Sequence, residues 1–318
     1  MNASLSHPQT SPLPAKVMIA IDGSAASQHA AVYARHLVAH GGTVRLVGVA
    51  ENPRALVPMG SLVGAALEAA REELSRDAEQ ALANARKIFA GSDLQVETEE
   101  IDLSKHRGDV VHALLDAARK WGADLVVAGA HQPHGLLRWI EGTVSEPLAR
   151  LSRCPTLIVP GSYSIKADQL PQRIVFAVDG SPHATQALKY GMRFATPETS
   201  LLALYVIDRA VRLSDLVPID VLEDAFIEEG TQALAAAKTL LAEVSSRSNT
   251  RLAKTAHTND DIAHTIVREA ANWNAELIVM GTHGRRGVAR WMLGSVAERV
   301  ARLAQTPVLL VHFNQAEQ

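Results

Sequence analysis

An internal duplication is the feature that most constrains how this chain folds. The segment from Gly129 to Val159 aligns without gaps on the segment from Gly281 to Val311, and nearly half of the aligned positions are identical. Earlier in each half, an apolar run ends in Asp-Gly-Ser, at Asp22 and again at Asp179. A chain of 318 residues is long enough for two domains that each bury a core. The sequence therefore predicts two tandem copies of one domain, not a solenoid of small repeats.

Each half alternates short apolar runs with helical patterns, which is typical of a parallel sheet covered by helices on both faces. In the first half we expect strands at Lys16 to Ile21, Val44 to Val49, Leu94 to Ile101, Leu125 to Ala128 and Thr156 to Val159, and helices at Gly64 to Phe89, Gly108 to Trp121 and Thr143 to Leu151. In the second half we expect strands at Arg173 to Val178, Leu277 to Met280 and Pro307 to Val311, and a helix at Val296 to Leu303. The resulting division is a flexible tail (1–15), a first domain (16–160), a polar linker (161–171) and a second domain (172–313).

Composition excludes several classes of function. A formal net charge of −3, with the basic residues scattered among acidic ones, gives no electrostatic case for binding nucleic acid. No apolar run approaches the roughly 20 residues of a membrane-spanning helix. The single cysteine, Cys154, cannot form an internal disulfide or a cysteine-based zinc site, and its apolar setting favours a buried structural thiol. We therefore expect a cytoplasmic protein that needs neither a membrane nor a nucleic acid.

A loop rich in glycine, Gly281 to Ser295, joins an expected strand to an expected helix. The first N–H groups of a helix have no partner within the helix and carry partial positive charge, so a phosphate is a natural ligand there. Glycine also lets the backbone approach a ligand where a Cβ atom would obstruct it. This loop predicts a nucleotide-phosphate site. It lacks the Gly-Lys-Ser/Thr ending of a P-loop NTPase.

The chain resembles the universal stress protein family in its ATP-binding branch. The resemblance rests on Asp179 at the end of a strand and on a loop in which Gly281, Gly284 and the pair Gly294-Ser295 are separated by two and nine residues. It covers the chain apart from the tail and the linker, and the duplication is similar to that of the tandem members. A lone three-glycine fingerprint would be far less specific, because here the spacing, the preceding strand and the following helix all agree.

The resemblance implies an α/β fold of two doubly wound, Rossmann-like domains, each a five-stranded parallel sheet of order 3-2-1-4-5. The resemblance also implies that a nucleotide binds at the carboxyl ends of strands one and four, which is the switch point of such a sheet. In this family the last strands pair edge to edge, so the two domains are expected to form a pseudo-dimer within one chain. A homodimer and an unidentified protein partner are open.

The family's adenosine contacts are an aspartate and a valine ending the second strand, which fall here on Asp179 and Val206. The resemblance further implies that Gly281 borders the ribose, that Gly284 passes the phosphates, and that the start of the last helix donates N–H and hydroxyl groups. Mg²⁺ or Mn²⁺ bridging the phosphates of ATP is compatible with this. The full set of expected nucleotide contacts is Ala177, Asp179, Ser181, Val206, Gly281, His283, Gly284, Arg285, Gly294, Ser295 and Val296.

Some of these residues also have ordinary structural interpretations. Asp179 precedes a helix start and could serve as its cap. His283 could contact phosphate or be an exposed loop histidine. Arg285, with its neighbours Arg286 and Arg290, could clamp phosphate oxygens or form a solvated basic rim.

The first half departs from the motif. Asp22, Val49, Gly129, Gly142 and Thr143 match the second half, but Gln132 replaces the middle glycine and Pro133 follows it. A side chain there would enter the phosphate space, and proline removes a donor. Glu141 adds negative charge beside the expected anion site. We expect this half not to hold ATP in the usual way.

The predicted function is nucleotide-dependent regulation of a stress response, with ATP bound in the second domain. The expected site has neither a lysine nor a convincing base for phosphoryl transfer, so any ATP hydrolysis should be slow. Two alternatives stay open. One is a slow ATPase or phosphotransferase, and the other is a nucleotide-independent scaffold for another ligand or a protein.

Overall fold

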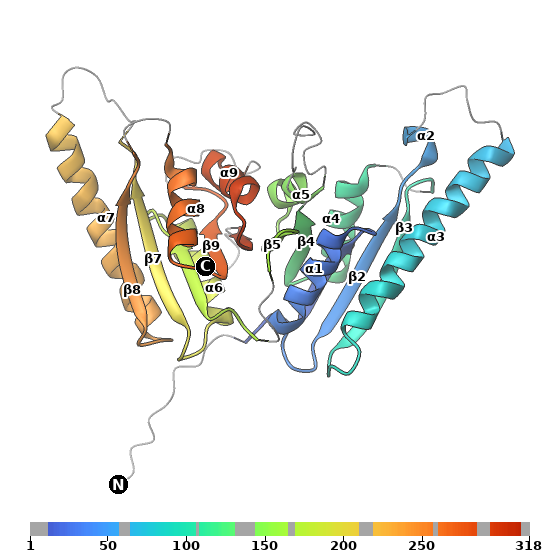
Figure 1. The fold of residues 1–318 in the computed structure, drawn as a ribbon, viewed down its shortest axis with the longest axis horizontal. Helices are drawn as coiled ribbons and strands as arrows, with labels where there is room; N and C mark the ends of the chain where they lie inside the picture. Colours follow the sequence, from blue (N-terminus) through green and yellow to red (C-terminus); the bar gives the residue numbers. More distant parts are fainter. Residues whose placement is uncertain are drawn as a thin grey trace, which may run out of the picture. The chain divides into compact units, whose positions relative to one another are not determined.

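The computed structural model describes residues 12–56, 64–105, 108–130, 144–164, 169–209, 219–256, 260–284 and 293–312. The chain divides into two compact units, one from Pro14 to Gln169 and the other from Leu170 onward. Each unit contains one copy of the repeat, and Figure 1 shows both as sheets flanked by helices.

The first unit alternates strands and helices from its first residue. Its strands are β1 (Lys16–Ile21), β2 (Thr43–Ala50), β3 (Gln95–Asp102), β4 (Leu125–Ala130) and β5 (Thr156–Pro160). Its helices are α1 (Ala25–Ala34), the 3-10 turn η1 (Arg35–Leu37), α2 (Pro53–Leu56), α3 (Gly64–Ile88), α4 (Val110–Trp121) and α5 (Ser145–Leu151).

Within its described residues, the second unit repeats this order without a counterpart to the short α2. Its strands are β6 (Arg173–Ala177), β7 (Ser200–Ile207), β8 (Ser248–Lys254), β9 (Leu277–Gly281) and β10 (Val308–Val311). Its helices are α6 (Pro182–Gly191), the 3-10 turn η2 (Met192–Phe194), α7 (Ile219–Ala242), α8 (Ile262–Asn272) and α9 (Ser295–Leu303).

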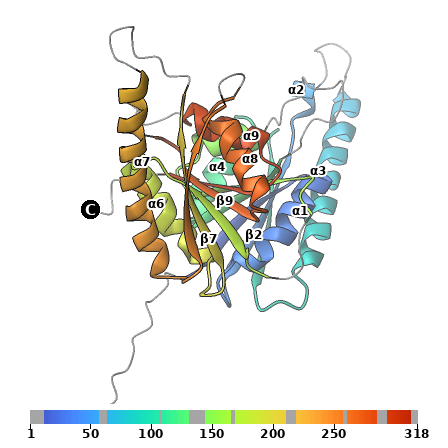
Figure 2. The ribbon, with the colours of Figure 1, turned by 60° about the vertical axis from the view of Figure 1, so that its left-hand side comes forward.

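Both sheets are parallel and doubly wound. The strand order is β3-β2-β1-β4-β5 in the first unit and β8-β7-β6-β9-β10 in the second, which confirms the predicted order 3-2-1-4-5. In the second unit α6 packs beside α7 on one face, while α8 packs against α9 on the other (Figure 2). The first unit pairs α1 with α3 and α4 with α5 in the same way. The predicted pairing of the two domains stays a prediction.

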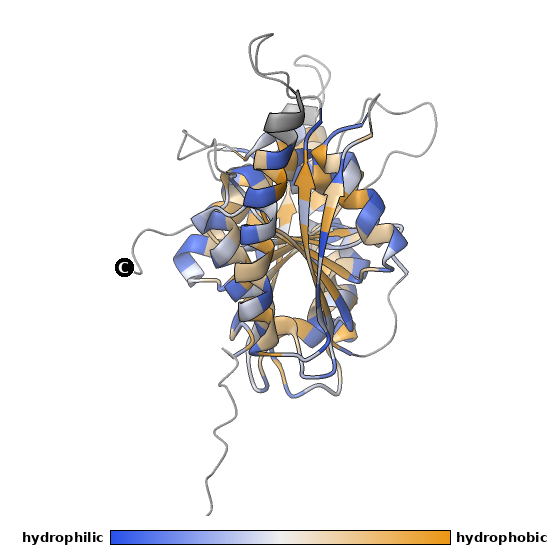
Figure 3. Cartoon of the chain, turned by 90° about the vertical axis from the view of Figure 1, so that its left-hand side faces the viewer, coloured by the Kyte–Doolittle hydropathy of each residue, from blue (hydrophilic) through white to orange (hydrophobic). Residues whose placement is uncertain are grey.

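Central strands are buried on both faces, as a sheet between two helix layers requires. Val17, Met18 and Ile19 in β1 are fully buried, and so are Ile174 and Val175 in β6. Figure 3 shows the apolar residues concentrated in the strands and the hydrophilic ones on the outward faces of the helices. The uninterrupted apolar runs that predicted these strands therefore reflect burial on two sides.

Two helices begin two residues later than predicted. The helix expected from Gly108 begins at Val110 as α4, after the cap residue Asp109. The helix expected from Thr143 begins at Ser145 as α5, because Val144 has non-helical backbone angles (φ −120°, ψ −48°). Pro147 explains the delay. In a helix starting at Thr143 its ring would clash with the carbonyl four residues earlier, whereas as the third residue of α5 it lies where helical N–H groups have no partner anyway.

Helices α4 and α8 end in the same left-handed turn. Gly122 follows α4 with φ 71°, and the matching residue after α8 is Asn274 with φ 55°. Behind each turn a backbone bond closes the helix end, from Ala123 to Ala118 (3.0 Å) and from Ala275 to Ala270 (2.9 Å). In the second copy, asparagine therefore adopts a left-handed backbone conformation that glycine adopts more easily.

Candidate functional site

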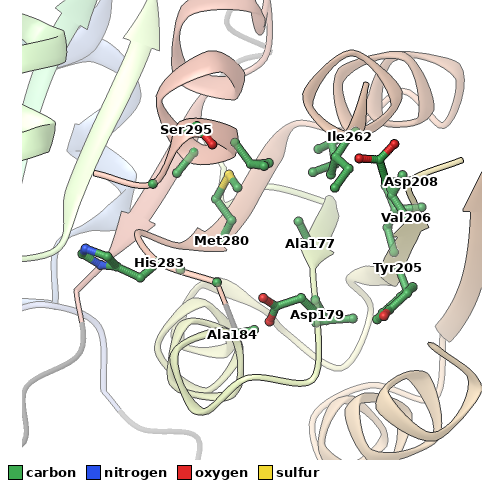
Figure 4. Close-up of a pocket in the computed structure, with 18 of the residues that line it drawn as sticks. Ala177, Asp179, Ala184, Tyr205, Val206, Asp208, Ile262, Met280, His283 and Ser295 are labelled. Atoms are coloured by element: carbon green, nitrogen blue, oxygen red, sulfur yellow. The ribbon is translucent and has the colours of Figure 1, made fainter. Parts of the chain in front are cut away.

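A cavity of about 540 Å³ opens where β6, β7 and β9 end. β6 pairs with both β7 and β9, so the chain leaving Ala177 enters the space between two neighbouring strand ends. The start of α9 completes the wall, as Figure 4 shows. The volume falls within the roughly 300 to 1,000 Å³ of small-molecule sites, and its position is the one at which open α/β sheets bind ligands.

Most of the predicted contact residues lie together on this wall. They are Ala177, Asp179, Val206, Gly281, His283, Gly284, Gly294, Ser295 and Val296. Ser181 is not among the lining residues, and Arg285 lies outside the described residues, as do Arg286 and Arg290. That these residues contact a nucleotide stays a prediction.

A tight turn fixes Asp179 at the end of β6. Its Oδ1 accepts a hydrogen bond from the Ser181 N–H (3.0 Å), and Gly180 between them has φ 79°, which suits glycine. Ser181 is the cap of α6, because its hydroxyl accepts from the Ala184 N–H (3.1 Å) and the residue is 3% exposed. The structural alternative for Asp179 is thereby corrected, because Ser181 and not Asp179 caps the helix.

The end of β7 turns a backbone donor and acceptor toward the cavity. The ladder between β6 and β7 closes with the bond from the Val178 N–H to the Leu204 carbonyl (2.9 Å), while the Ile207 carbonyl bonds on the opposite side, to Thr255 (3.0 Å). Backbone groups two residues apart on a strand face the same neighbour. Val206 therefore directs its N–H and C=O to the side where β6 has ended.

The first glycine of the loop is required by packing. A Cβ atom on Gly281 would lie 3.1 Å from the backbone of His183, in the first turn of α6. At the matching Gly129 the same atom would lie 2.4 Å from the carbonyl of Ala26 in α1. Both copies thus bring the end of this strand directly against a helix, whether or not a ligand binds.

The second glycine lies against Asp179. A Cβ atom built on Gly284 would be 2.8 Å from Oδ2 of Asp179, closer than real Cβ contacts. The sequence suggested that a side chain here would intrude on phosphates. In this structure its first obstacle is the carboxylate of the other half of the site.

Thr282 anchors the loop to the start of α9. It is fully buried, its N–H donates to the Val311 carbonyl (3.1 Å), and its own carbonyl accepts from the Gly294 N–H (2.8 Å). Gly294 is the N-cap of α9 and makes no side-chain cap bond. The N–H groups of the first turn, at Ser295 and Val296, are therefore not satisfied by a cap side chain, and both residues line the cavity.

Two histidines pair beside the loop. The rings of His183 and His283 have centroids 5.7 Å apart, and the Nδ1 atom of His283 is 3.0 Å from the Thr282 hydroxyl. In Figure 4 the imidazole of His283 points away from the cavity, so a phosphate contact would need another rotamer. Burial lowers the pKa of His183, and the neighbouring His283 lowers it further, while the Asp179 carboxylate opposes both.

Sequence reasoning missed several wall residues, namely Tyr205, Asp208, Phe226, Ile262, Ile266 and Met280. Asp208 could have been predicted from the sequence, since it follows Val206 by two residues and so lies on the same side of the strand. Phe226 and Ile262 come from α7 and α8, and only the packing of these helices brings them to the wall.

The described wall is acidic. It carries two carboxylates, Asp179 and Asp208, and within the described residues neither lysine nor arginine. Across the same part of the chain no group of three or more His, Cys, Asp or Glu residues is placed to hold a metal ion. An anion entering this cavity would meet positive charge first at the N-terminus of α9.

Comparison with known proteins identifies both copies. The model of the universal stress protein family matches residues 15–160 and again residues 171–312. The chain belongs to the universal stress protein family.

Its relatives include proteins with the same tandem layout. A universal stress protein of Mycolicibacterium smegmatis is 28% identical over 307 residues, covering 93% of this chain and 96% of its own. One from Methanocaldococcus jannaschii is 34% identical over 147 residues, which cover 45% of this chain and 84% of its own. The crystal structure of a universal stress protein from Archaeoglobus fulgidus superposes with a TM-score of 0.61 at 19% identity, covering 95% and 97% of the two chains, and so shows the same fold.

The first copy of this universal stress protein keeps the turn but not the described helix start. Ser24 caps α1, and its N–H donates to Oδ1 of Asp22 (3.1 Å), as at Asp179. By alignment, Gly294 and Ser295 correspond to Gly142 and Thr143, which lie outside the described residues together with Gln132, Pro133 and Glu141. Because α5 begins only at Ser145, helical N–H groups start two residues later than in α9.

None of the helices in the described part of this universal stress protein combines the length and apolarity needed to cross a bilayer.

Proposed function

We propose that the second domain of this universal stress protein binds ATP, and that its occupancy regulates a cytoplasmic stress response by favouring one conformation or partner contact. The observation that carries the proposal is the convergence of three features on one cavity: the backbone pair of Val206, the carboxylate of Asp179 and the uncapped start of α9.

The β7 end of the cavity suits adenine. The Watson–Crick edge of adenine offers an acceptor at N1 and a donor at N6, which complement the N–H and C=O of Val206. Apolar side chains of Phe226, Ile262 and Ile266 line the same region and can cover the faces of a flat ring. Asp179, between this region and the loop, would accept hydrogen bonds from ribose hydroxyls.

The α9 end suits phosphates. The N–H groups of Ser295 and Val296 and the hydroxyl of Ser295 can donate to phosphate oxygens, and the helix end adds partial positive charge. Gly294 allows the backbone to approach closely. Mg²⁺ or Mn²⁺ would enter with the nucleotide and offset repulsion between its phosphates and the Asp179 carboxylate.

The first domain is proposed not to bind ATP in this way. The late start of α5 supports this, since Val144, which matches Val296, has non-helical backbone angles. The outcome would be one nucleotide for each chain.

Calorimetric titration with ATP and Mg²⁺ tests the proposal. Wild type should bind one equivalent. Gly284→Gln should lose most of this affinity, because its Cβ atom collides with Asp179. Gly23→Gln is the matched control, since a Cβ atom there meets nothing within 4 Å, and it should bind like wild type.

No binding by wild type, or full binding by Gly284→Gln, would contradict the proposal. Phosphate release measured on the same samples addresses the ATPase alternative. Turnover that depends on a divalent ion and disappears in Asp179→Ala would favour an enzyme over a regulator.

A further inference from the structure

We infer that Asp208 makes the cavity select purines with a 6-amino group over those with a 6-oxo group. The inference rests on the proposed binding of a nucleotide in the second domain, and it concerns a residue outside the glycine motif and outside the Asp179–Val206 pair.

Asp208 directly follows the last residue of β7, and its side chain lines the cavity. It lies two residues beyond Val206, so its position continues the same side of the strand. In Figure 4 its carboxylate lies beside Ile262, at the opposite end of the cavity from His283. This is the end away from the start of α9, where the base of a bound nucleotide would lie.

The exocyclic amine of adenine has two hydrogens. When one bonds to the Val206 carbonyl, the second still needs an acceptor, and a carboxylate beyond the end of the strand supplies one. A hydrogen bond to a charged acceptor is stronger than one between neutral groups. Asp208 therefore stabilises a bound purine that carries an amino group at C6.

A 6-oxo purine presents lone pairs to the same carboxylate, and two acceptors facing each other repel. Within the described residues, the wall holds no lysine or arginine that could reverse this polarity. The Val206 pair also opposes a 6-oxo base, because its N–H then meets a protonated N1. The contribution of Asp208 is therefore the part of the ATP-over-ITP selectivity that is lost when residue 208 is substituted.

Titrations with ATP and with ITP, each with Mg²⁺, separate these contributions. Wild type should prefer ATP by at least tenfold. Asp208→Asn can donate to a 6-oxo group, so its ratio of affinities should fall by about tenfold or more. Asp208→Glu keeps the carboxylate and should keep a preference for ATP. Glu228→Gln, on the exposed face of α7, is the control and should leave the ratio unchanged.

A purely structural role for Asp208 would weaken both ligands equally and leave the ratio unchanged, which would overturn the inference. Equal binding of ATP and ITP by wild type would overturn it as well, with the proposed function intact. Failure of wild type to bind either nucleotide would instead remove the proposed function and this inference with it.

Discussion

Gly284 lies against Asp179 in the wall of the cavity, and a Cβ atom at position 284 would lie 2.8 Å from Oδ2 of the carboxylate. A side chain at position 284 would therefore force the Asp179 carboxylate to move from its place in the cavity wall. This contact joins two segments that the sequence separates by about a hundred residues.

The contact predicts energetic coupling between the two residues. Gly284→Ala should weaken ATP binding by about tenfold or more in wild type, but by less in an Asp179→Ala background, where the carboxylate is gone. Calorimetry on the four proteins of this double-mutant cycle measures the coupling. Gly284 is exposed, so the unfolding free energy should barely change. Additive effects would show that the alanine acts elsewhere, on the phosphates for example.

The histidine pair predicts a titration below the usual range. Because burial and His283 lower the pKa of His183, its NMR titration midpoint should lie under 6.5. His283→Ala should raise that midpoint, and Asp179→Asn should lower it further, since Asp179 favours the protonated form. The unfolded state binds this proton more readily, so the contribution of His183 to stability is present above pH 6.5 and is lost as the pH falls. A midpoint unmoved by both substitutions would contradict the coupling.

Cys154 should be almost inert. Burial raises the pKa of its thiol to about 12, with a further contribution from Asp124, and the Sγ atom donates to the Ala123 carbonyl (3.0 Å). The thiolate is the reactive form, so native protein at pH 8 should react with a thiol reagent about a thousandfold more slowly than protein unfolded in guanidinium. The chain has a single cysteine, which lets total labelling report this site alone. Rates within tenfold of each other would contradict the expectation.

The left-handed turn after α8 offers a stabilising substitution. Asn274→Gly should raise the unfolding free energy of the second domain by about 0.5 to 1 kcal/mol, because glycine adopts φ 55° without strain. Gly122→Ala should destabilise the first domain by a similar amount for the opposite reason. Urea denaturation, fitted with one transition for each domain, measures both. A loss of stability in Asn274→Gly would show that the asparagine side chain matters more than the backbone.

The sequence predicts most of this fold because its signals are local or repeated. Apolar runs located β1 at Lys16–Ile21, the bounds that the structure has, since strands buried on both faces need consecutive apolar residues. The duplication predicted the second domain, because segments that align with each other are expected to have the same strands and helices. The helix starts expected at Gly108 and Thr143 were each two residues early, and for the second of them Pro147 was visible in the sequence and carried the reason.

The candidate site was predicted less completely. The glycine loop was predicted from its own residues and the roles of Asp179 and Val206 came from a family resemblance, and the structure brings them to one cavity. Phe226 and Ile262 could not be found, since their presence depends on how α7 and α8 pack. The rotamer of His283 and the contact between Asp179 and Gly284 are likewise properties of the folded chain that no spacing encodes.

The steric reason for Gly129 and Gly281 has a consequence for how binding is inferred in duplicated chains. A glycine that must lie against a helix will persist in a copy that has stopped binding, so its presence carries no information about ligands. The informative positions are those at which the two copies differ: the residue at 284, which is Gln132 in the first copy, and the residue at 299, which is Pro147 there. A copy that no longer binds the ligand can thus be recognised from the positions at which it differs from the binding copy.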